Sequence, residues 1–95
     1  MLHTLTTSPF RCDFPAILRL LAADDDVLLL QDGVIAALEG SAALEALLNA
    51  PINLYALRED LQARGLIAQI SPKVAAVSYT DFVKLTVRNP QQMAW

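Results

Sequence analysis

The residue best suited to nucleophilic or sulfur chemistry is Cys12, the single cysteine of the chain. It follows Arg11 and lies near the start of a predicted helix, and both a neighbouring cation and a helix start favour the thiolate. Asp13 opposes this effect, and no second cysteine is present to resolve a disulfide. These residues favour an incidental thiol in a surface loop over a nucleophile, so Cys12 remains the one weak candidate for catalysis.

The single histidine, His3, lies in an apolar segment that is predicted to form the first strand. No second histidine and no cysteine sits at metal-ligand spacing from it. The consecutive residues Asp24, Asp25 and Asp26 lack the alternate-residue ligand spacing of a calcium loop. We therefore expect no metal and no cofactor, a structural or interface role for His3, and a solvated turn at the three aspartates.

The segment Gln31-Asp32-Gly33 follows a short apolar run that is typical of a buried parallel strand. Open α/β sheets place their ligand crevices at this carboxyl edge, which makes Asp32 a candidate contact residue. Asp-Gly is also an ordinary turn pair, and the chain has no glycine-rich phosphate motif. A small-ligand regulatory site near Asp32 stays open as a weaker alternative, with no ligand indicated.

The apolar side chains of Met93 and Trp95 lie in a tail that shows no helical or strand period. A tryptophan there is expected to pack, either on its own domain or against another subunit. Tryptophan is enriched in the energetic centres of interfaces. Trp95, Met93, His3 and Asp32 are therefore the candidate interface residues.

These residues must be positioned by an α/β layer fold, because short apolar runs alternate with helical patterns along the chain. The expected strands cover residues 1–6, 27–30, 52–56 and 74–78. The expected helices cover residues 14–23, a region from 34 to 48 that breaks at Gly40, residues 59–64, and a last helix that Thr80 would cap. Residues 67–70 are ambiguous between strand and loop.

The composition points to one compact domain, residues 1–95, that interacts with other proteins. The hydrophobic content of 55% and mean hydropathy of +0.40 exceed what a small monomer usually needs, which suggests a partner surface. The net charge is -3, so the chain lacks the excess of basic residues that binding to nucleic acid phosphates requires. The amino terminus has no signal-peptide pattern and no apolar run could span a membrane, so a cytoplasmic protein is expected.

Several blocks are distributed over the whole chain: residues 1–5 with Ser8-Pro9, residues 28–34, residues 54–57 with 59–61, residues 63–66, and the ending from Tyr79 to Val83 through Pro90, Met93 and Trp95. Together, these blocks resemble the TusB/DsrH family. The resemblance implies a DsrE-like open, mostly parallel sheet of four to five strands with helices on both faces. No catalytic residue is carried over by it, because the sulfur-accepting cysteine of such a complex belongs to TusD.

The resemblance also implies a non-catalytic subunit that assembles with TusC and TusD into a heterohexamer with two copies of each subunit. TusA would deliver persulfide sulfur to this complex and TusE would receive it. The MnmA thiouridylase would then place the sulfur on the wobble uridine of tRNA as 2-thiouridine. The alternative, that Cys12 itself accepts persulfide sulfur, stays open because some DsrH relatives carry a cysteine of their own.

Overall fold

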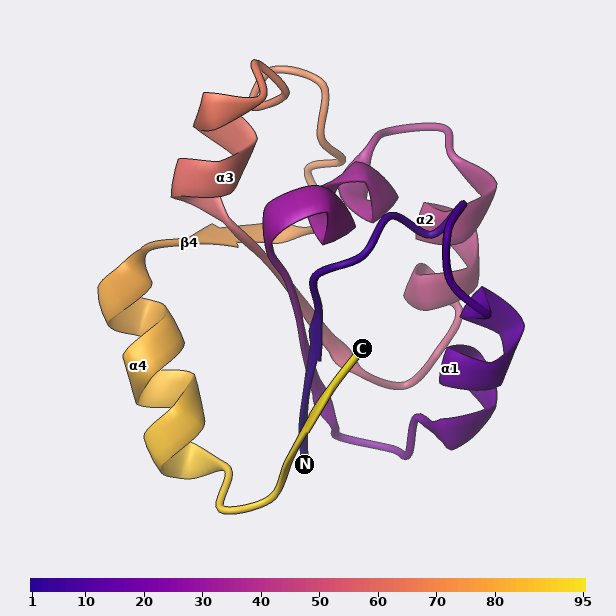
Figure 1. Ribbon diagram of the computed structural model, residues 1–95, viewed down its shortest axis with the longest axis vertical. Coiled ribbons are helices and arrows are strands. Elements are labelled where there is room, and N and C mark those ends of the chain that lie inside the picture. The colour runs from indigo at the N-terminus through magenta and orange to yellow at the C-terminus, as the bar shows by residue number, and fades with distance from the viewer.

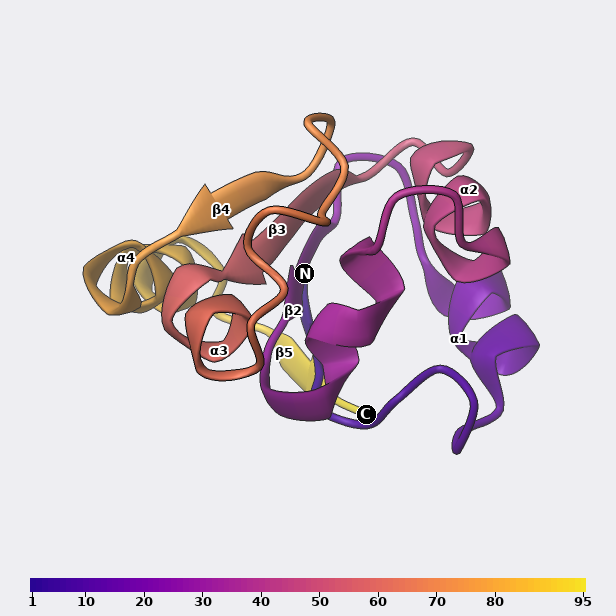
Figure 2. The same cartoon turned by 90° about the horizontal axis from the view of Figure 1, so that it is seen from above.

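A computed structural model describes residues 1–95 and contains one open sheet of five parallel strands (Figure 2). The strand order is β4-β3-β2-β1-β5, and every neighbouring pair is parallel. The bounds are β1 Leu2–Leu5, β2 Asp26–Leu29, β3 Asn53–Leu57, β4 Ala75–Val77 and β5 Gln92–Ala94. The predicted fold class, an open and mostly parallel sheet of four to five strands, is confirmed.

The helices divide unequally between the two faces of the sheet (Figure 1). On one face lies the larger core, to which α1, the 3-10 helix η1, α2 and α3 contribute Ile17, Val34, Leu44 and Leu61. On the other face α4 packs alone, with Leu85 against Leu2 and Leu28. The bounds are α1 Phe14–Leu20, η1 Gln31–Ala37, α2 Ala42–Leu48, α3 Arg58–Ala63 and α4 Tyr79–Arg88.

This asymmetry follows from the direction in which the chain crosses the sheet. The strands β1 to β4 are added in one direction, so right-handed crossovers place their connections on one face. The connection from β4 back to β5 runs the opposite way and places α4 on the other face. Five strands about 4.8 Å apart span roughly 19 Å, whereas one helix is about 10–12 Å wide. A single helix therefore leaves part of that face uncovered.

The central strand β2 explains the continuous apolar run in the sequence. Val27 and Leu29 belong to the larger core, and Leu28 between them faces α4. All three side chains are buried because both faces of this strand are covered. None of the helices is long and apolar enough to cross a membrane.

Several local predictions need correction. The tail forms the edge strand β5 beside β1, although its sequence shows no period. The helix cap is Ser78, not Thr80, because Ser78 and Asp81 form a reciprocal capping box. Residues 34–37 belong to a 3-10 helix that begins earlier, at Gln31. The ambiguous stretch 67–70 contributes only an isolated bridge from Ile70 to Leu38.

Candidate functional site

The thiol of Cys12 is half-buried and packs against the larger core. Burial raises the pKa of Cys12, and the negative charge of Asp13 raises it further. The helix that begins just beyond it is capped by the Asp13 side chain, which accepts from the Ala16 N–H. The environment of Cys12 therefore favours the neutral thiol, which is the poorer nucleophile.

His3 is at the centre of a buried polar cluster, the His3–Asp25–Trp95 cluster. The indole N–H of Trp95 donates to His3 Nδ1 at 3.2 Å, and His3 Nε2 lies 2.9 Å from Asp25 Oδ2. Because the indole nitrogen is a donor only, Nδ1 must be the unprotonated nitrogen, and Nε2–H donates to Asp25. The two rings also stack, with their centroids 6.3 Å apart and their planes inclined at 16°.

Asp25 is fixed by further donors in this cluster. It accepts from the Ala22 N–H at 2.9 Å and from the amino terminus at 3.2 Å. Burial by itself would raise the pKa of Asp25, but these hydrogen bonds and the one from His3 outweigh it and hold the pKa below its usual value. The cluster connects β1 and the end of β5 to the loop before β2. Its acceptors, His3 Nδ1 and the Asp25 carboxylate, are already hydrogen-bonded within the chain.

Trp95 lies against its own domain. Its backbone N–H donates to the Thr4 carbonyl at 2.8 Å, and its carbonyl accepts from the Thr6 backbone and hydroxyl. Met93 pairs with His3 across β1 and β5 and stays 40% exposed. The structure therefore places three of the four candidate interface residues, His3, Met93 and Trp95, together at one edge of the sheet.

Asp26 binds the end of α4 to the start of β2. Its buried carboxylate accepts from Arg88 at 2.7 Å, from the Asn89 side chain at 2.9 Å and from the Asn53 side chain at 3.0 Å. Burial would raise the pKa of Asp26, but these three donors overcome it and lower the pKa. The expected solvated turn is thus wrong for Asp25 and Asp26, which are both buried, and holds for the exposed Asp24.

The turn after β2 holds Asp32 outside any cavity. Asp32 is exposed and pairs with Arg64, the C-cap residue of α3, at 3.1 Å. Gln31 before it has a left-handed backbone with φ of 52°, and its N–H donates to Asp60 Oδ2 at 2.6 Å. Gly33 lies so close to β1 that a Cβ atom would approach the Leu5 carbonyl oxygen to 1.9 Å. This turn is therefore closely packed, and it holds no crevice at the strand end.

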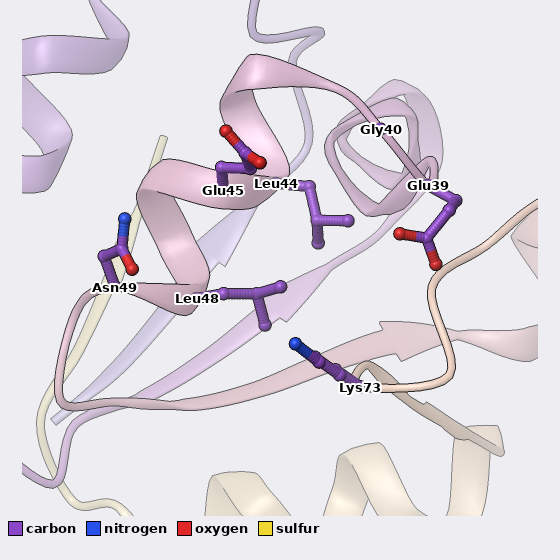
Figure 3. A pocket seen from close by; sticks show the side chains of 7 residues that line it. All are labelled: Glu39, Gly40, Leu44, Glu45, Leu48, Asn49 and Lys73. Carbon is purple, nitrogen blue, oxygen red and sulfur yellow. The ribbon is translucent and has the colours of Figure 1, made fainter.

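The structure contains two cavities, and neither includes Cys12 or Asp32. The smaller, of about 300 Å³, lies between α2 and the loop that carries Lys73 (Figure 3). Leu48 and Lys73 point toward one another across it, and the carboxylates of Glu39 and Glu45 stand at its rim. Its lining residues include no cysteine, serine, threonine or histidine.

The larger cavity, of about 450 Å³, lies between α4 and the strands β3 and β4. Its lining residues are Tyr55, Val77, Asp81, Lys84, Leu85 and Arg88. The sequence analysis did not predict this cavity. The cavity depends on Tyr55 from a distant strand, so the local sequence gave no signal for it.

The chain matches a family described as "DsrH like protein" over residues 7–92. It is 80% identical over 95 residues to Protein TusB of Erwinia tasmaniensis and 61% identical over 95 residues to Protein TusB of Escherichia coli K12. Both matches cover 100% of this chain and 100% of the relative.

Solved structures share the fold. The ychN protein of Escherichia coli superposes with a TM-score of 0.78 over 99% of this chain and 97% of its own, at 14% identity. Protein Tm0979 of Thermotoga maritima superposes with a TM-score of 0.69 over 96% of this chain and 97% of its own, at 27% identity. The fold is therefore shared well beyond the range of close sequence similarity.

Proposed function

This chain belongs to the DsrH family, and on that premise we propose that it is a non-catalytic structural subunit of a TusBCD sulfurtransferase complex. The complex would relay persulfide sulfur from TusA to TusE for 2-thiolation of the wobble uridine of tRNA, which implies a cytoplasmic protein. Full-length identities of 80% and 61% to proteins named TusB carry the proposal. Its direct partners would be TusC and TusD, in a heterohexamer with two copies of each subunit.

The raised pKa of Cys12 supports a structural role, in which this chain carries no sulfur-accepting thiol. A relay cysteine must attack a persulfide as a thiolate, and burial and Asp13 both raise the pKa of Cys12. The chain has no second cysteine that could take the sulfur onward. The accepting thiol of the proposed complex would therefore lie on a partner, which this subunit would support and orient.

The β5 edge supports assembly with partners. Met93 lies on the edge strand β5, whose outer side has no neighbour in this chain, and Trp95 directly follows that strand. His3 is 1% exposed and would act on that edge only through Trp95. Asp32, on the turn after β2, is a separate exposed contact point.

The proposal is tested by the 2-thiouridine content of tRNA in cells that lack the gene. The deletion strain is complemented with the wild-type chain or with Cys12→Ser, and 2-thiouridine is measured by mass spectrometry of digested tRNA. Equal restoration by both is expected, because the chain supplies structure and no sulfur-bearing thiol.

Two results would change the proposal. Restoration by the wild-type chain alone would move Cys12 onto the relay, and an added sulfur on Cys12 after incubation with a loaded donor would then identify it as an acceptor. Unchanged 2-thiouridine on deletion would remove the chain from tRNA thiolation altogether.

A further inference from the structure

Both ring nitrogens of the buried His3 are used in hydrogen bonds. The side chain is 1% exposed, Nδ1 accepts the indole N–H of Trp95 at 3.2 Å, and Nε2–H donates to Asp25 Oδ2 at 2.9 Å. A neutral imidazole has one donor and one acceptor, so this arrangement fits the neutral form completely. The hydrogen bond from Trp95 therefore depends on the protonation state of His3.

A second proton on His3 can enter only at Nδ1, because Nε2 already carries a hydrogen. Nδ1 is the same atom that accepts the indole N–H, and the indole nitrogen is a donor only. In the imidazolium form, two N–H groups would face one another across 3.2 Å. Protonation of His3 and its hydrogen bond with Trp95 therefore exclude one another.

The surroundings of the imidazole contain a counter-ion for the charged form. Asp25 already lies 2.9 Å from Nε2 and would pair with an imidazolium. Burial would raise the pKa of Asp25, but its hydrogen bonds hold the pKa below the usual value, so this carboxylate keeps its charge in mildly acidic solution. The amino terminus, 3.2 Å from Asp25 Oδ1, is the cation of the cluster and opposes a second positive charge.

No other charged group lies within hydrogen-bond or ion-pair distance of the imidazole. Its register neighbours on the two adjacent strands, Val27 of β2 and Met93 of β5, are uncharged. The carboxylate of Asp26 is bound by the end of α4 on the opposite face of the sheet. The remaining charged residues of the loop before β2 and of α1, Asp24 and Arg19, are exposed. Asp25 and the amino terminus are thus the charges that act on His3 directly.

The strand β5 has few other contacts that hold it in place. It has three residues, lies at the sheet edge and pairs only with β1. Just beyond it, the Trp95 N–H donates to the Thr4 carbonyl and the Trp95 carbonyl accepts from the Thr6 N–H. The bond to His3 is the only hydrogen bond of the Trp95 side chain. Loss of that bond is therefore expected to weaken the end of the sheet.

We propose that His3 is a pH-sensitive switch for β5, in which uptake of a proton at Nδ1 releases the Trp95 indole and loosens β5 from β1. The proton adds to the Nδ1 lone pair and gives an imidazolium, the indole keeps its own hydrogen, and no other covalent bond changes. The inference goes beyond the proposed function and does not depend on it, because every group involved belongs to this chain. Met93 lies on the same strand, so the switch would alter the exposed edge of the sheet.

The chain has one histidine and one tryptophan, so His3 and Trp95 can be followed separately. The wavelength of maximum tryptophan emission and the NMR signals of the imidazole are recorded for the full-length chain between about pH 8 and pH 5, the range in which histidine changes charge. We expect the emission to move to longer wavelength with the same midpoint as the imidazole titration. Wavelength is measured instead of intensity, because an imidazolium quenches an indole even where the ring does not move.

Hydrogen exchange locates the loosened segment. The amides of Trp95 and Thr6 form the hydrogen bonds between the end of the chain and β1. Their protection factors are expected to fall about tenfold when His3 becomes charged, the factor that corresponds to the loss of one ordinary hydrogen bond. The amides of β2 and β3, at the sheet centre, should keep their protection, which distinguishes the switch from unfolding in acid.

Trp95→Phe tests the reciprocal effect. If protonation of His3 expels the indole, the indole must oppose protonation by the same free energy. Removal of the indole donor should therefore raise the midpoint of the imidazole titration by about 0.5–1 pH unit, which corresponds to one hydrogen bond of ordinary strength. Met93→Leu is the matched control on β5, and its midpoint should equal that of the wild-type chain.

His3→Gln supplies a side chain that has both a donor and an acceptor but does not titrate in this range. The emission wavelength of this variant should not change with pH. If the variant does not fold, the comparison of the two wild-type titrations and the Trp95→Phe midpoint still decide the question.

Several results would overturn the switch. In one, His3 becomes charged while the emission wavelength of Trp95 stays constant, and in another, Trp95→Phe titrates with the wild-type midpoint. A third is an imidazole that stays neutral until the amides of β2 and β3 also lose protection, since acid would then only unfold the chain. The 2-thiouridine content of tRNA, which tests the proposed function, is independent of all three results.

Discussion

The indole N–H of Trp95 donates to Nδ1 of His3 at 3.2 Å, and this contact links the last strand of the sheet to its first. The imidazole passes the connection on to Asp25, 2.9 Å from Nε2. His3 and Trp95, which lie near opposite ends of the chain, are thus in direct contact. Because β5 has only three residues and lies at the sheet edge, this side-chain contact is expected to contribute much of its stability.

Replacing Trp95 with Phe removes the indole donor and keeps an aromatic ring. The unpaired Nδ1 of buried His3 should lower the free energy of unfolding by about 1–2 kcal/mol, measured by urea denaturation with circular dichroism. Met93→Leu, on the strand that Trp95 directly follows, loses no polar atom and should leave the stability within about 0.5 kcal/mol of wild type. A Trp95→Phe protein as stable as wild type would show that the indole hydrogen bond contributes nothing.

Asp26→Asn should make the free energy of unfolding depend less on pH in the acid range. The pKa of Asp26 is lowered in the folded protein, so its contribution is full above the unfolded pKa of about 4 and is lost as pH falls through the folded pKa. The variant should be about 1–3 kcal/mol less stable at pH 7, and the difference should vanish at the lowest pH that allows folding. Urea denaturation at a series of pH values measures it.

The exposed Asp24 is the matched control for that experiment. Its side chain makes no hydrogen bond, and its left-handed backbone with φ of 68° suits Asn as well as Asp. Asp24→Asn should lose stability at acid pH in the same way as the wild-type protein. Parallel curves for Asp26→Asn and wild type would mean that the carboxylate charge at Asp26 is not coupled to folding.

The order of strands and helices could be predicted because a run of neighbouring apolar residues indicates a buried element from the local sequence alone. The run at Val27 to Leu29 identifies a strand covered on both faces, and the structure places it at the sheet centre. The strand β5 could not be found in this way, because its residues Gln92 to Ala94 are exposed and carry no alternation. Its structure comes from pairing with β1, which is distant in the sequence.

The buried aspartates were missed for a related reason. The hydrogen-bond partners of Asp26 include Asn53 and Asn89, 27 and 63 positions away, so no local spacing reveals them. An acidic run normally indicates a solvated turn, and only the folded chain brings enough donors to bury two of its members. The exposed apolar residues of α4 did have a local signal. Phe82 and Leu85 form the apolar face that packs on the core, and Tyr79, Val83 and Val87 recur every four residues in addition to that face.

The raised pKa of Cys12 makes a kinetic prediction. Alkylation by iodoacetamide requires the thiolate, so its rate in the folded protein should rise at higher pH than in the same protein unfolded in urea. Asp13→Asn removes the nearby negative charge and should move the folded profile to lower pH, while Asn still caps α1. A folded profile at lower pH than the unfolded one would instead indicate an activated thiol and favour Cys12 as a relay residue.

Gly33→Ala tests how tightly the turn after β2 is packed against β1. The added methyl group would lie 1.9 Å from the Leu5 carbonyl oxygen, which is backbone and cannot rotate away as a side chain can. Relief requires η1 to separate from β1, and the larger core contains residues of both, including Val34 and Leu5. We expect a loss of more than about 3 kcal/mol in the free energy of unfolding, or failure to fold.

Gly40→Ala adds the same methyl group at a position with open space. No atom lies within 4 Å of that Cβ, and only the left-handed backbone, with φ of +83°, resists the change, at a cost of about 1–2 kcal/mol. Urea denaturation of the two variants therefore separates steric overlap from backbone preference. A similar loss in both would mean that β1 and η1 move apart easily, and the turn that carries Asp32 would then be a deformable surface and not a fixed contact point.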